Sequence, residues 1–385
     1  MNATHPDHSP ALRFNCGEWA GAFGDIGTDL PLLVAMLAAT GLAAGPVFFA
    51  FGVALILSGW LYRLPMPVQP LKAMAVVVIA GQASGPQLQL AGLILGTLML
   101  VLAMSGALTW LVRVIPLCVV RGVQVGLALN LGWAALRMAG RHGVAGWMVA
   151  LVALGMLLWL RRSPRWPGGL LVIGAGLLWT LGTQVDWSVG FARPALTTLT
   201  LPELPWSDWS VVLGLLVLPQ LPLSLSNSLV ATQRTVADLF PSRPVSARGL
   251  GFTFAGLNFL APLLGGVPVC HGCGGLAGHY ALGARTGGSV IIYGSVFLLG
   301  GALLGGALAE IARLFPFPLL GALLLLESGV LVSLARDQVA SPTLFLVTAP
   351  VALCCVFLPY GYLIGAGLGI LLYHAFLHTS SLRAA

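Results

Sequence analysis

Long apolar stretches follow one another along nearly the whole chain, separated by short breaks that contain charged residues, proline or glycine. A helix needs about 20 residues to cross a hydrocarbon core of about 30 Å, and most of the stretches approach or exceed that length. The expected spans lie near residues 15–41, 45–62, 88–112, 116–138, 143–160, 168–185, 209–234, 247–264, 287–309, 315–334, 341–358 and 360–378. The pattern therefore predicts an all-α polytopic membrane protein.

Two further stretches, 67–83 and 268–283, are too short or too interrupted to be ordinary spans. Each opens with a proline-containing phrase, PMPVQP at 65–70 and GVPVCH at 266–271. Proline lacks the backbone donor that a helix needs, so neither stretch can be a continuous helix. Unwound backbone at membrane depth is tolerated where protein or a water-filled cavity covers it. We expect an extended piece followed by a half-helix in each, which makes these the third and tenth of fourteen elements.

The two broken elements are related by a fixed offset along the chain. The Pro-Val pair at 67–68 recurs at 268–269, an offset of 201 residues, and the same offset places 18–29 of the first span opposite 219–230 of the eighth. Seven elements separate equivalent positions, and because seven is odd, the second half must run through the membrane in the opposite direction. Paired broken elements in such an inverted repeat are a pointer to the binding site of a transporter.

The distribution of arginine supports this count of elements. With the N-terminus inside, thirteen arginines fall on the cytoplasmic side and four outside, as the positive-inside rule requires. The cytoplasmic set is Arg13, Arg63, Arg113, Arg121, Arg161, Arg162, Arg165, Arg234, Arg243, Arg248, Arg285, Arg336 and Arg383, and the external set is Arg137, Arg141, Arg193 and Arg313. We therefore expect both termini in the cytoplasm, with Lys72 inside the membrane.

Composition excludes several other classes of protein. Hydrophobic residues make up 58% of the chain and charged residues 8%, whereas soluble domains usually carry about 25% charged residues. A water-soluble enzyme, a disordered chain and a free nucleic-acid-binding protein are therefore excluded. The net charge of +7 is explained by arginines in loops, so no nucleic acid is expected as a partner. The six cysteines show no disulfide spacing, and no signal peptide is recognisable at the N-terminus.

Carboxylates inside the first predicted span are candidates for function, because charged groups in a membrane are costly. Glu18, Asp25 and Asp29 are spaced by 7 and 4 residues and so share one helical face. Asp25, with Thr28 and Asp29 beside it, is a candidate for proton coupling or gating. The alternative is a structural role, as a partner of Lys72 or of backbone amides. Glu18 could also lie at the cytoplasmic interface.

The two half-helices predict an anion-binding site. Helix N-termini attract anions through unpaired N–H groups and the helix dipole, so two such ends meeting at the midplane would hold an anion between them. The candidate contacts are Gln69 and Lys72 from element three, His271, Gly272, Cys273 and Gly274 from element ten, and Gln220 and Asn227 from span eight. Two alternatives stay open: Lys72 as the counter-ion of Asp25 or Asp29, and His271 as a packing residue.

The remaining polar residues of the spans allow further interpretations. Gln220, Ser224 and Asn227 share a face of span eight, either toward the anion or in helix-to-helix hydrogen bonds. Asn130, Asn258 and Glu327 are additional polar candidates within spans, and Glu327, in the second half of span twelve, is a candidate for a role in transport.

Motifs for metal binding, ATP hydrolysis and intramembrane catalysis are not supported by the sequence. The CxxC at 270–273 has two histidines nearby, but it lies in a glycine-rich apolar stretch without a second CxxC, so no metal is expected. No GxxxxGK[ST], HExxH or GxSxG pattern occurs, which argues against an ATPase and against an enzyme. No cofactor is expected.

Several phrases resemble those of the molybdate transporter family within the sulfate permease superfamily. They are GAFGDIGTDLPLLVA (21–35), PMPVQPLKAMA (65–75), PQLPLSLSNSLVAT (219–232), ADLFP (237–241) and VPVCHGCGGLAGHYALGARTGGSV (267–290), about a fifth of the chain. The resemblance implies a fold of seven plus seven inverted elements, shared with nucleobase–proton symporters, and a substrate held between elements three and ten. No regulatory STAS domain is expected, as in the molybdate branch. Cys273 stands where a small residue such as alanine is expected.

The resemblance also implies a division into a core domain and a gate domain. The expected segments are a cytoplasmic tail (1–13), the core in two parts (14–112 with elements one to four, 208–312 with elements eight to eleven) and the gate in two parts (113–207 with elements five to seven, 313–385 with elements twelve to fourteen and a short tail). A homodimer through the gate domains is expected by analogy.

The sequence thus predicts a secondary transporter of a tetrahedral oxyanion, molybdate first and sulfate second, in the cell membrane (the inner membrane in a bacterium). Proton-coupled import by alternating access is the expected mechanism, with protons and the lipid bilayer as the other partners. The alternatives are a sulfate or other inorganic-anion transporter, a nucleobase or organic-anion symporter of the same fold, and a passive channel. A nucleobase site would call for an acidic residue in element eight or ten, where this chain has Gln220, Asn227 and His271.

Overall fold

Helices account for nearly all the regular structure in the computed structural model, which describes residues 11–108, 110, 116–160, 168–184, 196–333, 335–339 and 341–378. The first half contains α1 (Cys16–Ala22), α2 (Ile26–Thr40), α3 (Ala44–Tyr62), β1 (Gln69–Pro70), α4 (Lys72–Ile79), α5 (Gly85–Ser105), α7 (Leu117–Ala139), α8 (Gly143–Leu160) and α9 (Gly168–Trp179). The second half contains α10 (Trp209–Val212), α11 (Leu218–Leu223), α12 (Thr232–Leu239), α13 (Ala247–Leu263), β2 (Val269–Cys270), α14 (Cys273–Ala281), α15 (Gly288–Leu314), α16 (Phe317–Ser333), α17 (Arg336–Val339), α18 (Pro342–Phe357) and α19 (Gly361–His378).

Many of these helices have the length and composition of membrane spans. Among the described residues, six helical stretches are long and apolar enough to cross a membrane, and four shorter apolar helices accompany them. The predicted arginine cluster at 161–165 lies outside the described residues, as do Arg113, Arg193 and Arg383.

Elements three and ten are broken as the prolines predict, and they meet each other. β1 and β2 pair antiparallel, with Gln69 opposite Cys270 and Pro70 opposite Val269. Each strand leads into a half-helix, α4 after β1 and α14 after β2. Gln69 and Cys270 are equivalent positions under the 201-residue offset, as are the first residues of the two half-helices. Antiparallel pairing of equivalent positions requires a two-fold relation between the halves, so the inverted repeat is confirmed.

The packing of the long helices has the same symmetry. α3 packs against α15, and its counterpart contact in the other half joins α13 to α5. Likewise α7 packs against α18, and α16 packs against α8. The α3–α15 contact is close because glycines face each other, and a Cβ on Gly294 would lie 2.8 Å from the carbonyl oxygen of Gly52. Small residues of this kind let membrane helices approach closely.

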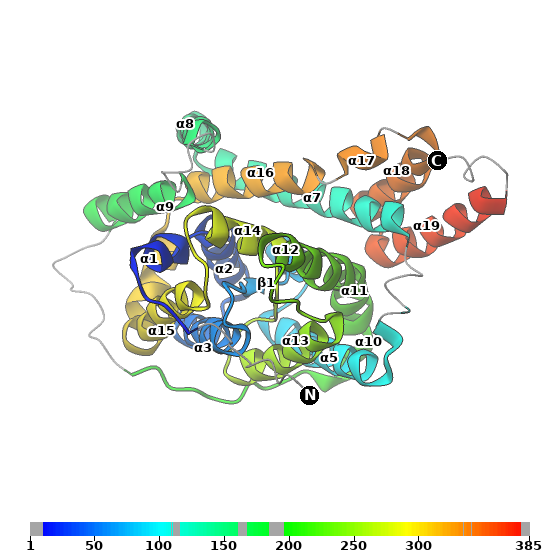
Figure 1. Cartoon of the computed structure of the whole chain (residues 1–385). Coiled ribbons are helices and arrows are strands. Elements are labelled where there is room, and N and C mark those ends of the chain that lie inside the picture. Colours follow the sequence, from blue (N-terminus) through cyan, green and yellow to red (C-terminus); the bar gives the residue numbers. More distant parts are fainter. Residues whose placement is uncertain are drawn as a thin grey trace, which may run out of the picture.

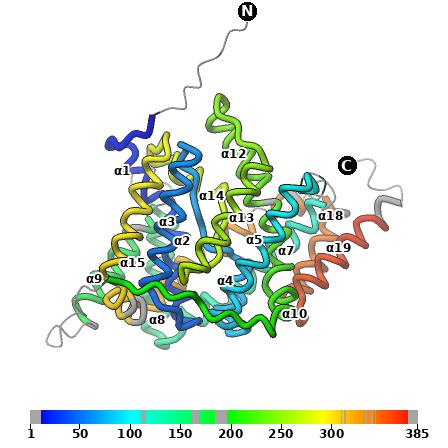
Figure 2. Tube along the Cα trace, turned by 90° about the horizontal axis from the view of Figure 1, so that it is seen from below, coloured from blue at the N-terminus to red at the C-terminus, as the bar shows by residue number. Residues whose placement is uncertain are grey.

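The helices form two layers, which Figure 1 shows one above the other. The lower layer contains α1–α5 and α10–α15, and the upper layer contains α7–α9 and α16–α19. Figure 2 shows the long helices of the lower layer, such as α3, α13 and α15, running side by side. The two layers touch where α16 and α9 pack against α2 and where α7 packs against α4 and α11.

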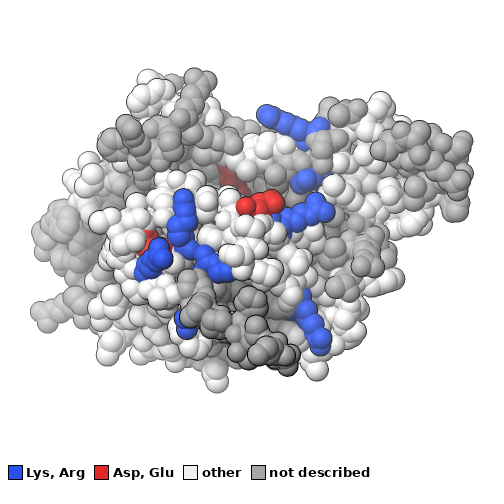
Figure 3. Space-filling view, in the orientation of Figure 1, with Lys and Arg blue, Asp and Glu red and all other residues white. Residues whose placement is uncertain are grey.

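Arginine-rich loops converge at one end of the lower layer. The Arg243 guanidinium donates to the carbonyl oxygens of Arg63 (3.2 Å) and Arg285 (3.0 Å), which ties together loops far apart in the sequence. Figure 3 shows one face of the molecule, on which more Lys and Arg than Asp and Glu side chains are visible. Glu18 belongs to this end, where its carboxylate accepts from the backbone N–H groups of Arg285, Thr286 and Ser289 at 2.9–3.1 Å. Glu18 therefore holds the loop that leads into α15.

Two predicted spans are less regular than the apolar pattern suggests. The first is interrupted at residues 23–25, so that α1 and α2 are separate helices and Asp25 lies at their junction. The eighth contains π-helical turns at Leu213–Val217 and Ser224–Ala231, on either side of α11. Pro219 and Pro222 remove backbone donors from this span, which explains why its hydrogen bonds shift to the wider pattern. Gln220 and Ser224 still contact each other, with 3.2 Å between the amide nitrogen and the hydroxyl oxygen.

Candidate functional site

The N-termini of α4 and α14 lie on either side of the β1–β2 pair, and α14 opens onto free space. Gly274, in the first turn of α14, is exposed, and a Cβ built on it would meet no atom within 4 Å. Cys273 beside it is half-buried, and the Lys72 ammonium lies within electrostatic range of its thiol. The structure therefore brings Lys72, Cys273 and Gly274 together around one accessible helix N-terminus.

Lys72 forms an ion pair with Glu327 of α16. The two side chains are 16% and 10% exposed, so the pair is largely screened from bulk solvent. This corrects the expectation that Asp25 or Asp29 is the direct counter-ion of Lys72. The physical reason is that α16 packs against α2 and carries Glu327 to the start of α4. Asp25 and Asp29 remain within electrostatic range of Lys72.

Asp25 lies against the first turn of α14. Its Oδ2 atom accepts a hydrogen bond of 2.6 Å from the Gln69 side-chain amide, and the Thr28 side chain is within hydrogen-bond reach. A Cβ on Gly275 would collide with this carboxylate, so glycine is required there for α14 to approach. Gly272 plays a similar part as the N-cap of α14, because a Cβ there would collide with the Gln69 side chain. Asp25 and Gln69 thus fill the buried side of the α14 N-terminus.

Asp29 is fully buried, and its carboxylate lacks hydrogen bonds from the described residues. Within the described part of the chain, neither of its carboxylate oxygens has a hydrogen-bond partner. The Tyr293 hydroxyl lies close enough to interact with it electrostatically, but the geometry of a hydrogen bond is lacking. Burial of an unpaired ionised carboxylate is strongly unfavourable. Asp29 is therefore a buried group whose charge state the surroundings do not stabilise by hydrogen bonding.

Span eight contacts both half-helices through its amide side chains. The Gln220 side-chain oxygen accepts from the backbone N–H of Ala73 at 3.0 Å, in the first turn of α4. Its amide nitrogen donates to Ser224 at 3.2 Å. Asn227, which is half-buried, accepts a 3.3 Å hydrogen bond from the Cys273 thiol. Gln220 therefore caps α4, whereas Asn227 lies beside the accessible turn of α14.

His271 is engaged on both sides of its ring. Nδ1 lies 3.0 Å from the carbonyl oxygen of Pro67, and Nε2 lies 3.0 Å from the Thr253 hydroxyl. Because both ring nitrogens have partners, neither is left for an anion. The ring is fully buried, and it fixes the backbone of the broken elements. Asn258 has a similar effect on β2, since its amide pairs with the backbone N–H and C=O of Val269. Within the described residues, no group of three His, Cys, Asp or Glu side chains is placed for a metal ion.

Arg121 is a residue near the site that the sequence analysis assigned to the cytoplasmic surface. It lies on α7 within electrostatic range of the Cys273 thiol, and its guanidinium donates to Gln124 at 3.0 Å. The sequence could have indicated this role, because Arg121 falls inside the predicted span 116–138 rather than in a loop. A charged residue within a span is a candidate for function.

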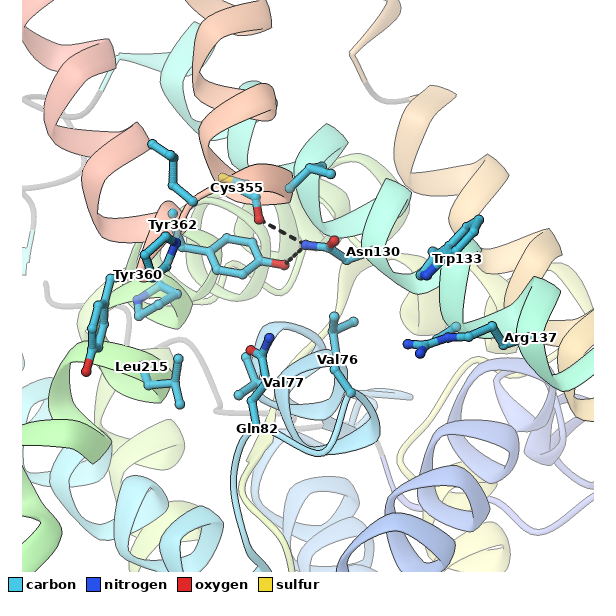
Figure 4. A pocket seen from close by; sticks show the side chains of 17 residues that line it. Val76, Val77, Gln82, Asn130, Trp133, Arg137, Leu215, Cys355, Tyr360 and Tyr362 are labelled. Carbon is cyan, nitrogen blue, oxygen red and sulfur yellow. Dashed lines mark hydrogen bonds between the residues drawn. The ribbon is translucent and has the colours of Figure 1, made fainter.

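A cavity of about 520 Å³ lies between the two layers, and Figure 4 shows it from close by. Val76 and Val77 of α4 form its floor, and Asn130 on α7 donates hydrogen bonds to the Cys355 carbonyl (3.1 Å) and the Tyr362 hydroxyl (2.8 Å) at its roof. Arg137 is the one charged side chain among the lining residues. The cavity therefore combines an apolar wall with one cation.

Comparison with known sequences places the chain among molybdate transporters. A family model described as "Molybdate transporter of MFS superfamily" matches residues 17–131 and 213–331. Molybdate transporter 1 of Arabidopsis thaliana is 31% identical over 375 residues, covering 85% of this chain and 81% of that protein. Molybdate transporter 1 of Chlamydomonas reinhardtii is 30% identical over 465 residues, covering 90% of this chain and 89% of that protein.

Comparison with solved structures identifies the fold. The transmembrane domain of the cyanobacterial bicarbonate transporter BicA superimposes with a TM-score of 0.68 at 17% identity, covering 93% of this chain and 98% of that domain. Murine Slc26a9, an anion transporter solved in an inward-facing state, gives a TM-score of 0.69 at 14% identity, covering 97% of this chain and 70% of that one. The predicted architecture of seven plus seven inverted elements with broken third and tenth elements is confirmed.

The difference in accessibility between two cysteines of the same motif tests the geometry of the α14 N-terminus. In variants that retain a single cysteine, a small sulfonate-bearing methanethiosulfonate should modify Cys273 at least about tenfold faster than Cys270, because Cys270 is buried in β2. The rates are measured from the mass of the intact protein. Equal rates at the two positions would show that the first turn of α14 is closed to anions.

Proposed function

The chain belongs to the molybdate transporter family, and we propose that it is a secondary transporter whose substrate is a tetrahedral oxyanion, molybdate before sulfate. The predicted resemblance to this family is confirmed, and membership makes the protein a membrane transporter of the anion-transporting type and not an enzyme. The substrate, the coupling ion and the transport cycle are the subject of the proposal.

The observation that carries the proposal is the accessible first turn of α14 with a lysine within electrostatic range of it. Gly274 exposes backbone there, Lys72 supplies a positive charge, and the helix dipole adds to the attraction for an anion. Asn227 lies beside the same turn and can donate through its amide. An oxyanion with several acceptor oxygens fits such a set of donors, with Arg121 as a second cation nearby.

The choice of molybdate rests on the names of the relatives, since molybdate and sulfate share shape and charge. The nucleobase alternative is less well supported, because ring N–H groups would need an acidic acceptor from span eight or α14. Neither 219–232 nor 268–283 contains an acidic residue. The neutral amides and the lysine at this place favour an acceptor-rich substrate.

The charge balance of the site supports coupling to protons. Three carboxylates stand against two cations here: Glu327 is paired with Lys72, Asp25 and Asp29 lie within electrostatic range of it, and Arg121 is the second cation. Two like charges about 4 Å apart repel by about 4 kcal/mol at an effective dielectric constant of about 20. A dianion entering such a site would meet an excess of negative charge unless carboxylates took up protons with it. We propose Asp25 and Asp29 as the groups that gain them, with Thr28 as a partner of Asp25.

The two layers suggest how the site alternates between the two sides of the membrane. We assign the lower layer as the core domain, which carries the site, and the upper layer as the gate domain, against which the core rocks. In the proposed topology, with both termini cytoplasmic, the cavity near Arg137 lies toward the external side. Its lining contains one cation and no carboxylate, so anions could enter through it. A homodimer through the upper layer is proposed as the assembly.

Binding of oxyanions to the purified protein tests the substrate. We expect tight molybdate binding that excess sulfate and uracil do not displace, measured by calorimetry. Lys72→Ala should weaken binding by about 10- to 100-fold, the equivalent of the ~1.5–3 kcal/mol of a charge-assisted hydrogen bond. Arg248→Ala is the control and should bind normally, because the exposed Arg248 lies in the first turn of α13 and its guanidinium donates to the carbonyl oxygen of Met104. Displacement of molybdate by sulfate would show that the site does not prefer molybdate and would assign sulfate as a substrate. Absence of any oxyanion binding would refute the proposal.

Proton movement tests the coupling. In proteoliposomes with a trapped pH indicator, an inward molybdate gradient should acidify the interior, and Asp25→Asn should reduce this signal because one of the proposed proton acceptors is removed. Acidification that persists undiminished in Asp25→Asn would exclude Asp25 as the coupling group. Molybdate uptake without acidification in the wild type would exclude proton symport altogether.

A further inference from the structure

The ion pair between Lys72 and Glu327 joins the two layers at the candidate site. Lys72 is the first residue of α4 in the lower layer and the only lysine in the sequence, whereas Glu327 lies on α16 of the upper layer. The side chains are in direct contact and mostly buried. An interaction of this kind fixes two elements relative to each other for as long as it lasts.

Lys72 needs a counter-ion in every state of the transporter. A buried ammonium without a partner is strongly destabilising, and so is the removal of one member of such a pair. In this structure Glu327 fills that role, with a carboxylate that presents two negative oxygens to the lysine. An oxyanion bound at the first turn of α14 would present the same chemistry to the same ammonium.

The groups around Glu327 determine what its release requires. Lys72 faces it from α4, and Asp25 at the α1–α2 junction and Asp29 on α2 lie within electrostatic range. The neighbouring helices α8 and α9 carry no charged residue, and α7 contributes Arg121 near Cys273. Once separated from Lys72, an ionised Glu327 would face two carboxylates and a dianion, so uptake of a proton favours the separation.

We infer that Glu327 is an internal competitor of the substrate: the incoming oxyanion displaces it from Lys72, and the released carboxylate takes up a proton. Displacement removes the direct link between α4 and α16, which couples occupation of the site to movement of one layer against the other. This inference rests on the proposed function and assigns a positioning and coupling role to a residue of the upper layer. Binding of the substrate thereby itself breaks the contact that holds the core against the upper layer.

The affinity of a Glu327→Gln variant tests the competition. Glutamine keeps the size of the side chain but cannot form the ion pair, so molybdate no longer has to displace a carboxylate. We expect the purified full-length variant to bind molybdate at least about tenfold more tightly than the wild type. Glu203→Gln, in an exposed loop, is the matched control and should leave the affinity unchanged.

The pH dependence of binding separates a coupling role from a structural one. In the wild type, affinity should rise as the pH falls, because proton uptake by Glu327 accompanies binding. In Glu327→Gln this slope should decrease by up to one proton per anion. If Glu327→Gln is not stable enough to purify, Glu327→Asp serves: its shorter side chain weakens the ion pair, so affinity should rise while the slope persists.

The outcomes distinguish this inference from the proposed function. Wild-type protein that binds no molybdate contradicts the proposed function itself. Wild-type binding combined with an unchanged or weaker affinity and an unchanged pH slope in Glu327→Gln would overturn the competition and leave the site standing. A double variant, Lys72→Gln with Glu327→Gln, should fold without the buried charges and bind molybdate more weakly than Glu327→Gln alone.

Discussion

Backbone that leaves a helix inside a membrane must find hydrogen-bond partners, and β1 and β2 find them in each other. Their antiparallel pairing around Gln69 and Cys270 joins the two halves of the inverted repeat at its two-fold axis. The half-helices α4 and α14 begin at equivalent places on either side of it, so two helix N-termini face the same region. His271 and Asn258 hold this arrangement through backbone contacts, and the rest of the site depends on it.

Symmetry of the backbone is combined with asymmetry of the side chains. Lys72 and Cys273 are equivalent under the repeat, yet one is a cation and the other a neutral thiol. The α4 end is capped by Gln220 and carries the charge, whereas the α14 end is left accessible at Gly274. In the proposed site, the anion approaches from the accessible α14 side, and Lys72 on the α4 side supplies the positive charge. We propose that the surplus of carboxylates around Lys72 links anion binding to proton uptake and to the contact between the layers.

The parts of the structure that follow from local chemistry could be predicted from the sequence. The prolines at 67 and 268 forbid a continuous helix, so the broken elements and their offset were predictable. The pairing of Lys72 with Glu327 was not, because it depends on how α16 packs against the lower layer. The engagement of His271 with Thr253 depends likewise on a contact between separate elements, which the residue types alone do not specify.

We propose that the substrate anion binds where the N-termini of α4 and α14 meet. Anomalous X-ray diffraction at the molybdenum absorption edge, from crystals of the molybdate complex, locates the metal atom of the anion directly. We expect one strong peak beside the first turn of α14, within contact distance of Lys72 and Gly274. A peak confined to the cavity near Arg137, with Lys72 still paired to Glu327, would contradict the account.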